Sequence, residues 1–151
     1  EVLAPIDLPK HAFYAPRQRY RADSLIRYLR KIKPNKYTKI IGLTEQDISM
    51  TKGGFKDYGI MGLGFKPGVS CIVSTHRIRR GAKNIKHLKE RLYKAACHEL
   101  GHNFGLPHCA DSETCMMRSA RGKVSNIDSC DFGFCDACRS KISTVLKPFK
   151  Q

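Results

Sequence analysis

Long hydrophobic runs and acidic residues are both scarce in this sequence. No stretch of eighteen consecutive apolar residues occurs in its 151 positions, so no membrane-spanning helix is expected. No apolar segment marks a secretory signal at its start. Only 13 residues are Asp or Glu, against 28 Lys or Arg, which gives a formal net charge of +15. A field of this sign favours acidic peptides or nucleic acid as partners.

Motifs for reading nucleic acid are also missing. The basic residues are spread along the chain, and no stacked-aromatic motif of the RNP type accompanies them. This is typical of a solvated basic surface, so a specific nucleic-acid partner is not expected. No internal repeat or low-complexity tract divides the chain, and its length suits a single domain over residues 1–151 with a real core. The chain starts at Glu1 without a methionine, and residues 2–6 look like a strand entered midway, so we expect further residues upstream.

One local pattern carries chemistry. Residues 98–108 read HELGHNFGLPH, which is the pattern HExxHxxGxxH. His98 and His102 are four residues apart, so on an α-helix they project from one face and can hold one Zn²⁺. Glu99 lies next to the first histidine and can act as general base on a zinc-bound water without being a ligand itself.

The residues after the second histidine complete the predicted site. Gly105 can take the left-handed conformation that ends a helix, and Pro107 keeps the helix from resuming. The chain can then turn back and bring His108 to the same metal. Three protein ligands leave a fourth position open, which indicates a catalytic rather than a structural zinc site. HExxH alone occurs by accident, but the full pattern would arise by chance in roughly one such chain in 10⁵.

The cysteines supply a second group of candidate ligands. There are 7 of them, and an odd number argues against a closed set of disulfides. Cys135 and Cys138 form a CxxC, the usual half of a four-cysteine zinc site, and Cys109 and Cys115 are the predicted other half. Four thiolates close a tetrahedral shell, so this zinc would be structural and would anchor the loop that carries His108.

Other readings of the cysteines stay open. The four could form two disulfides, or the CxxC could be redox-active, although the strand-then-helix setting of a thioredoxin motif is absent. Cys130 is a substitute ligand, since it also lies near Cys135. Cys71 sits in an apolar run and Cys97 in the segment of the zinc motif, and both are expected to be buried bystanders.

The segment from His98 to Cys138 resembles the archaemetzincin family of metzincin-clan zinc metallopeptidases. The resemblance rests on the extended zinc motif, on Cys109 directly after it, and on a Cys-x-Met that ends at Met117. A gap of seventeen residues and the CxxC at Cys135 follow, as in that family.

The resemblance implies a role for each matching residue. His98, His102 and His108 would hold a catalytic zinc, and Glu99 would be the general base. Met117 would lie in the turn beneath the three histidines, a place that Met116 could take only with a shifted register. The second, structural zinc would be held by Cys109, Cys115, Cys135 and Cys138, so two zinc ions per chain are expected.

The resemblance also implies fold and function. The fold would be an α/β (α+β) metzincin-like zincin: a twisted mixed sheet packed on helices, with an active-site zinc helix and an irregular, zinc-stabilised C-terminal part. The activity would be zinc-dependent hydrolysis of peptide bonds, with aminopeptidase and endopeptidase action both open. The substrate would be a peptide or protein, acidic ones being favoured by the charge. Reduced cysteine ligands suit the cytoplasm, and a monomer is favoured.

Two alternatives to a peptidase are weighed. One is a catalytically idle, zinc-stabilised binding module for acidic partners or nucleic acid. The presence of Glu99 argues against it, because that residue has no duty in a merely structural site. The other is a zinc hydrolase that acts on a non-peptide amide, which the sequence does not separate from a peptidase.

Periodicity and turn residues predict the elements around these motifs. Strands are expected over residues 2–8, 37–43 and 69–75. In the topology that the resemblance implies, residues 59–63 would form an antiparallel edge strand above the cleft. A helix capped by Asp23 or Ser24 should run to about residue 33, a long one should follow a cap at Asn84, and a last one should span 136–147. Residues 50–58 are predicted as a loop and 105–134 as irregular, while Glu90 and Lys94 should form an exposed pair on the long helix.

Overall fold

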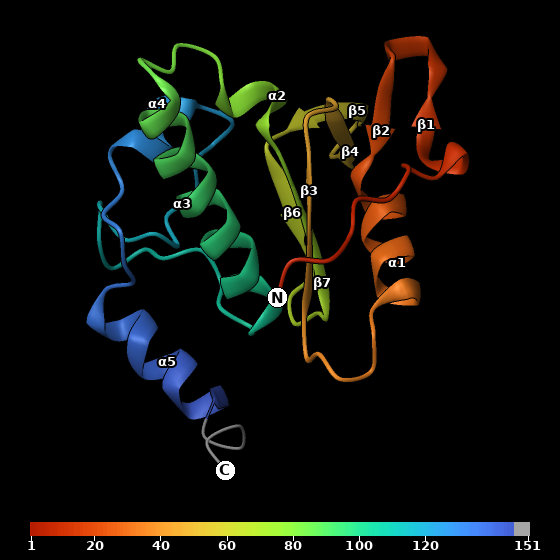
Figure 1. Ribbon diagram of the computed structural model, residues 1–151. Helices are drawn as coiled ribbons and strands as arrows, with labels where there is room; N and C mark the ends of the chain where they lie inside the picture. Colours follow the sequence, from red (N-terminus) through yellow and green to blue (C-terminus); the bar gives the residue numbers. More distant parts are fainter. Residues whose placement is uncertain (147–151) are drawn as a thin grey trace.

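The computed structural model describes residues 1–146 (Figure 1). Its strands are β1 (Phe13–Tyr14), β2 (Arg19–Arg21), β3 (Ile40–Thr44), β4 (Ile48–Lys52), β5 (Phe55–Ile60), β6 (Gly62–Gly64) and β7 (Ser70–Ser74). Its α-helices are α1 (Ala22–Ile32), α2 (Thr75–Ile78), α3 (Ile85–Asn103), α4 (Val124–Asp128) and α5 (Asp136–Leu146). Two 3₁₀ turns, η1 (Lys10–Ala12) and η2 (Ala15–Arg17), flank β1.

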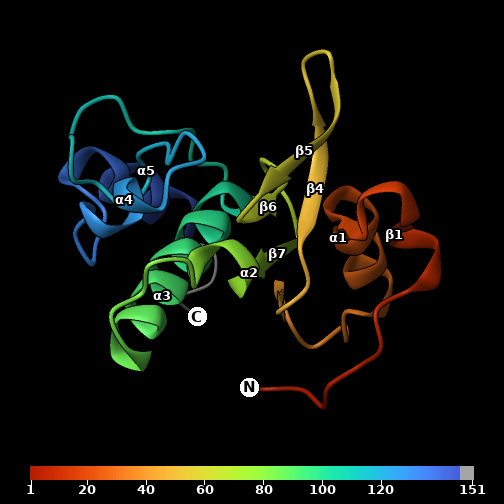
Figure 2. The ribbon, with the colours of Figure 1, turned by 90° about the horizontal axis from the view of Figure 1, so that it is seen from above.

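The strand β7 is the centre of a three-stranded mixed sheet. It pairs in parallel with β3 on one side and antiparallel with β6 on the other, so β6 is an edge strand. Helix α1 packs on one face of this sheet and α3 on the other (Figures 1 and 2). Because successive side chains of a strand alternate between faces, Ile72 joins the core under α1, whereas Val73 joins the core under α3. All five residues of β7 are accordingly buried.

A second mixed sheet is built in the order β1-β2-β4-β5. Its β4 and β5 form a hairpin that projects from the body of the molecule (Figure 2). Only Met61 separates β5 from β6, so the two sheets are directly joined. Mixed sheets packed on helices confirm the expected fold class, although the single sheet that was expected is divided into two.

The two long helices form for the reasons the sequence offers. Along α1, Leu25, Ile26 and Leu29 are buried on one face. The expected cap at Asp23 or Ser24 is wrong: the helix begins at Ala22, so both residues lie inside its first turn, and no side chain caps it. At the start of α3 the Asn84 Oδ1 accepts a hydrogen bond from a backbone amide at 2.9 Å, which is the expected cap.

Four further local predictions are wrong or shifted. Residues 2–8 form no strand, and Val2 is 97% exposed. Residues 50–58 are not a loop but most of the β4–β5 hairpin, which turns at Gly53 with a positive φ of 57°. Lys94 makes no exposed pair with Glu90: it is buried, and its Nζ donates to the backbone carbonyl of Cys130 at 2.5 Å. The strand expected from residue 37 begins at Ile40.

The edge strand predicted over residues 59–63 is divided at Met61 between the end of β5 and β6, and only β6 lies antiparallel to β7 at the edge of that sheet. The other element predictions fit the described residues. The last helix is observed as α5, and Lys147, its predicted end, lies outside the described residues. Residues 105–134 contain only the short α4, as the expectation of irregular structure requires. None of the helices within residues 1–146 has the length and apolar character needed to cross a membrane.

Candidate active site

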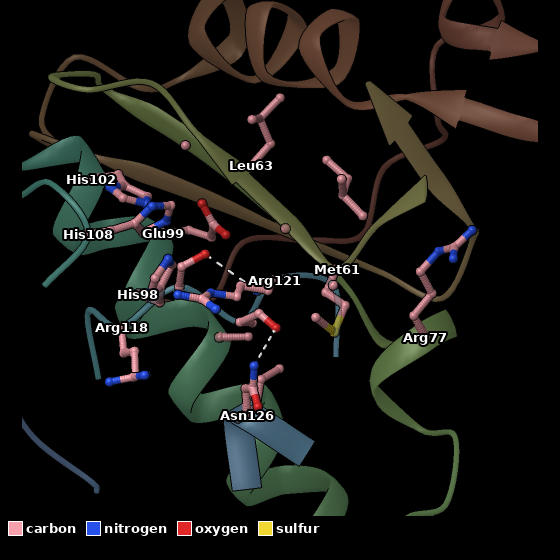
Figure 3. Close-up of a pocket in the computed structure, with 18 of the residues that line it drawn as sticks. Met61, Leu63, Arg77, His98, Glu99, His102, His108, Arg118, Arg121 and Asn126 are labelled. Atoms are coloured by element: carbon pink, nitrogen blue, oxygen red, sulfur yellow. Dashed lines mark hydrogen bonds between the residues drawn. The ribbon is translucent and has the colours of Figure 1, made fainter. Parts of the chain in front are cut away.

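The three histidines of the motif converge at the end of α3. His98 and His102 lie one turn apart on that helix, and their ring centroids are 4.7 Å apart. The ring of His108 lies 5.3 Å from that of His98 and 4.9 Å from that of His102. One nitrogen from each ring lies within 4.8 Å of the other two (Figure 3). The arrangement therefore places three imidazoles around one point.

The turn that brings His108 back depends on a glycine. Helix α3 ends in hydrogen bonds from Leu106 N to Gly101 O at 3.0 Å and from Gly105 N to His102 O at 2.8 Å. Gly105 has a φ of 91°, in the left-handed region that side chains disfavour. This pair of bonds is a Schellman ending, which is the turn that the glycine and the following proline predict.

Backbone carbonyls fix the orientation of two of the rings. Nδ1 of His98 donates to the carbonyl of Met116, and Nδ1 of His102 donates to the carbonyl of Leu106, both at 2.8 Å. Each Nε2 is then left with its lone pair, which is the form that a metal requires. Burial lowers the pKa of His98 to about 4, so its ring is neutral at ordinary pH. A neutral three-imidazole donor set fits zinc.

The carboxylate of Glu99 lies against the edge strand β6. Glu99 is only 9% exposed, and burial raises its pKa to about 8 in the metal-free protein, opposed by a hydrogen bond from Gly64. A Cβ on Gly62 would lie 2.7 Å from Glu99 Oε1, and one on Gly64 would lie 2.6 Å from the Glu99 backbone oxygen. The close approach of carboxylate and strand therefore requires glycine at both positions.

The two methionines after the motif take different places. Met117 is fully buried, and its sulfur packs against Gly101 of α3, between the two helical histidines in sequence. Its carbonyl accepts from Cys109 N at 2.9 Å. Met116 lines the cavity and supplies the carbonyl for His98. Met117, rather than Met116, is thus the residue beneath the histidine cluster.

The four predicted cysteines form a separate group. Their sulfur atoms in Cys109, Cys115, Cys135 and Cys138 all lie within 4.8 Å of one another. The Cys109 and Cys135 sulfurs are 3.6 Å apart, too far for the 2.05 Å of a disulfide, and all seven cysteines are free. The donor set of four converging thiols fits a structural zinc. Cys130, the substitute ligand, lies outside this group and lines the cavity beside the histidines.

A cavity of about 340 Å³ opens beside the histidines and Glu99. Figure 3 shows side chains around it from the end of β5 and β6, from helix α3, from the segment that leads into α4 and, at Arg77, from α2. Sequence reasoning missed Arg118, Arg121 and Asn126 in this wall, because no local pattern links them to the zinc motif. It also missed Asn103, whose amide donates to the carbonyls of Phe65 and Ser70 and so ties the β6–β7 loop to α3.

Comparison with known proteins settles the family. The model of peptidase family M54 matches residues 2–144. The chain belongs to this family. The archaemetzincin from Methanopyrus kandleri is 33% identical in sequence to this chain, over 93% of this chain and 75% of its own length. The archaemetzincin from Archaeoglobus fulgidus is also 33% identical, over 93% of this chain and 79% of its own length.

Solved structures of archaemetzincins agree with the fold. The crystal structure from Methanopyrus kandleri matches with a TM-score of 0.80 and 32% identity, over 93% of this chain and 73% of that one. The structure from Archaeoglobus fulgidus, complexed with malonate, matches with a TM-score of 0.74 and 27% identity, over 92% of this chain and 79% of that one.

Membership of the M54 family decides between the classes of function. The protein is a zinc metallopeptidase, so its substrates are peptides or proteins. The resemblance to archaemetzincins is confirmed. A catalytically idle binding module is not favoured.

Proposed function

We propose that His98, His102 and His108 hold the catalytic zinc and that Glu99 is the general base of peptide hydrolysis. The observation that carries this assignment is the convergence of one nitrogen from each ring within 4.8 Å, in the same cavity as the buried Glu99 carboxylate. Zinc held by three neutral imidazoles would polarise the scissile carbonyl and lower the pKa of water from about 15.7 towards about 7.

Glu99 carries out the proton transfers in this mechanism. Its carboxylate takes a proton from the attacking water and then passes it to the leaving amine. Gly62 and Gly64 support this role, because the space that they leave lets the carboxylate lie along β6. The carbonyls of Met116 and Leu106 keep two imidazoles in the tautomer that can bind metal.

The edge strand β6 is the proposed docking line for the substrate backbone. Among the described residues β6 pairs with β7 alone, and it lines the cavity beside Glu99. An extended peptide could add to such an edge through main-chain hydrogen bonds, and glycines permit the close approach. Endopeptidase and aminopeptidase action both fit this geometry.

A second, structural zinc is proposed on Cys109, Cys115, Cys135 and Cys138. Cys109 follows His108 directly, so a metal there would anchor the loop that carries the third imidazole. Thiol ligands must stay reduced, which supports a reducing compartment such as the cytoplasm. We further propose one catalytic domain that acts as a monomer on acidic peptides, the last on the strength of the +15 net charge.

A metal-dependent cleavage screen over a diverse peptide library tests this function. The zinc-loaded protein should cleave members of the library, lose that activity to a chelator, and regain it when zinc is restored. The His98→Ala variant, prepared in the same way, controls for contaminating peptidases. Cleavage that survives both the chelator and this variant would contradict the proposal.

A further inference from the structure

The cavity beside Glu99 is lined by basic side chains. Among the described residues that line it, Glu99 is the single acidic one, whereas five carry a Lys or Arg side chain: Lys52, Arg77, Lys94, Arg118 and Arg121. A substrate that enters it therefore meets a positive field near the reacting groups.

Most of these cations already have a partner within the protein. Arg77 is paired with Asp47 at 2.8 Å, and Arg118 is paired with Glu113. Lys94 donates to backbone carbonyls, and Lys52 lies 4.8 Å from the centre of an aromatic ring. Within residues 1–146 the Arg121 guanidinium makes no hydrogen bond or ion pair. Arg121 is therefore the cation with most donors left for a ligand.

The backbone around Arg121 holds it in an unusual conformation. Arg121 and Gly122 have positive φ values of 49° and 74°, and Lys123 N donates to Ala120 O at 2.9 Å. This is a turn with two left-handed residues, for which Gly, Asn and Asp are the favoured types. An arginine at the first of these positions is disfavoured by its own backbone. A backbone conformation that disfavours arginine, at the edge of a cavity, indicates that the arginine side chain has a function there.

Neighbouring residues brace this turn. Asn126 Nδ2 donates to the Ala120 carbonyl at 3.0 Å, the bond drawn next to Asn126 in Figure 3. Tyr58 lies on the facing wall, and a Cβ on Gly122 would come within 3.0 Å of its hydroxyl, so there is little room for the turn to shift towards it. Figure 3 shows the Arg121 side chain extending from the turn towards His98. Arg121 thus lines the same cavity as His98 and Glu99.

We propose that Arg121 is a specificity-determining residue, which binds a carboxylate that the peptide substrate carries close to its scissile bond. The planar fork of arginine can donate two parallel hydrogen bonds to a carboxylate. The group could be an acidic side chain or the C-terminal carboxylate of a short peptide, and both offer the same chemistry. This inference rests on the proposed peptidase function and assigns a substrate class to the same cavity.

Peptide binding tests the inference apart from turnover. The zinc-loaded Glu99→Ala protein is titrated with peptides that carry Glu or Gln at each of three positions on either side of the bond cleaved in the library screen. If the library screen finds no cleaved bond, Glu is placed at each position in turn of a peptide unrelated to the library. Each peptide is made as the free acid and as the C-terminal amide. Either the peptide with Glu at one particular position should bind about tenfold more tightly than the matching Gln peptide, or the free-acid peptide should bind about tenfold more tightly than its C-terminal amide.

Substitutions at Arg121 must then change that ratio. Arg121→Ala should bring the ratio of acidic-peptide to neutral-peptide affinity close to one, and Arg121→Lys should keep part of the wild-type ratio. Arg121→Glu should instead give a preference for Lys-containing peptides. Because a misfolded protein cannot reverse a preference, the last variant separates recognition from folding. Arg30→Ala removes the same charge from the exposed side of α1 and should leave the ratio and the activity unchanged.

The outcomes are separate from those of the cleavage screen. Dependence on an internal Glu identifies an acidic side chain as the source of the carboxylate, and dependence on the free C-terminus identifies a terminal carboxylate. Equal binding of every acid and amide pair, or a preference that persists in Arg121→Ala, would overturn the inference even if peptides are cleaved. Absence of cleavage with an Arg121-dependent preference intact would overturn the proposed function alone.

Discussion

Glycine controls the space around Glu99 at the scale of single residues. At Gly62 an added Cβ would lie 2.7 Å from Oε1, 2.8 Å from Cγ and 3.0 Å from Cδ of Glu99. These contacts are too short to keep, so the carboxylate would have to move away from β6. The reaction depends on the position of this group more than the fold does, because the clash is with the end of a side chain.

Replacing Gly62 by alanine should therefore impair turnover first. We expect kcat to fall at least tenfold, in line with the 10²–10⁴-fold value of a positioned base, while zinc content and melting temperature change little. Gly54→Ala is the matched control, since a Cβ there meets nothing within 4 Å. Wild-type kcat in Gly62→Ala, measured on one cleaved peptide, would show that Glu99 does not need this space.

The sequence predicts the ligands far better than their surroundings. His98, His102 and His108 are separated by a few residues and a glycine turn, so their convergence is a local property. The carbonyl of Met116, the glycines of β6 and the guanidinium of Arg121 come to the site only through tertiary packing. The Arg-Gly dipeptide at residues 121–122 was the one signal for the turn that faces the cavity, and it is a weak one.

Helix α4 is the element whose position depends most on side-chain tethers. It has five residues, too few to be stable as an isolated helix, yet it carries Asn126 and part of the cavity wall. Asp128 at its end accepts from Arg91 Nε at 2.6 Å and lies 2.8 Å from His87 Nε2, both on α3. Arg91 is buried, so this carboxylate neutralises a charge that solvent does not reach.

Asp128→Asn should lower the free energy of unfolding by about 1.5–3 kcal/mol, the usual contribution of a hydrogen bond to a charged group. The pKa of Asp128 is lowered from 3.8 to about 2, chiefly by the bond from Arg91. Because its folded pKa lies below the unfolded one, its stabilisation is present above about pH 4 and lost as the pH falls towards 2. Denaturant melts should show the two proteins converging over that range, with Asp7→Asn as an exposed control. A difference that does not depend on pH would argue against this ion pair.

Helices were predicted more accurately than strands for a physical reason. A helix closes its hydrogen bonds within one segment, so the spacing of Leu25 and Leu29 or the cap at Asn84 can be read locally. A strand needs a partner: residues 2–8 are apolar enough for one but pair with none in the described chain. The β4–β5 hairpin was taken for a loop because its tip holds two glycines and much of its sequence is polar. Helical spacing places Lys94 on the exposed face, but it is buried against the end of α4, where its Nζ donates to the carbonyls of Ile127 and Asp128.

At the scale of the whole molecule, the sheets with α1 and α3 are stabilised by apolar cores, whereas the C-terminal part packs around the grouped cysteines. Two apolar clusters lie on either side of β7, under α1 and α3. The third cluster, beyond α3, consists of Leu106, Met117 and two of the four grouped cysteines. With one short helix in residues 105–134, that region has little else to stabilise it. Metal bound there would contribute directly to folding, as in zinc-finger peptides where it is worth about 10–16 kcal/mol.

Cys135→Ser should consequently lower the melting temperature more than His98→Ala does, although only the latter removes a predicted catalytic ligand. Elemental analysis should find about two zinc ions per wild-type chain, and a chelator should remove the one on the histidines first, because that site keeps an open position. Cys97→Ser, outside both groups, should retain both ions. A single zinc together with disulfides among the four cysteines would refute the two-site arrangement.

The role of Glu99 is the central claim, and the Glu99→Ala variant tests it most directly when zinc content and turnover are measured on the same preparation. Zinc content should stay at the wild-type value, because the carboxylate is not among the proposed ligands. Turnover of a peptide that the wild type cleaves should fall by at least about 10²-fold, the lower bound for loss of a general base. Activity that survives the substitution would contradict the proton transfer assigned to Glu99, and loss of zinc would instead make it a ligand.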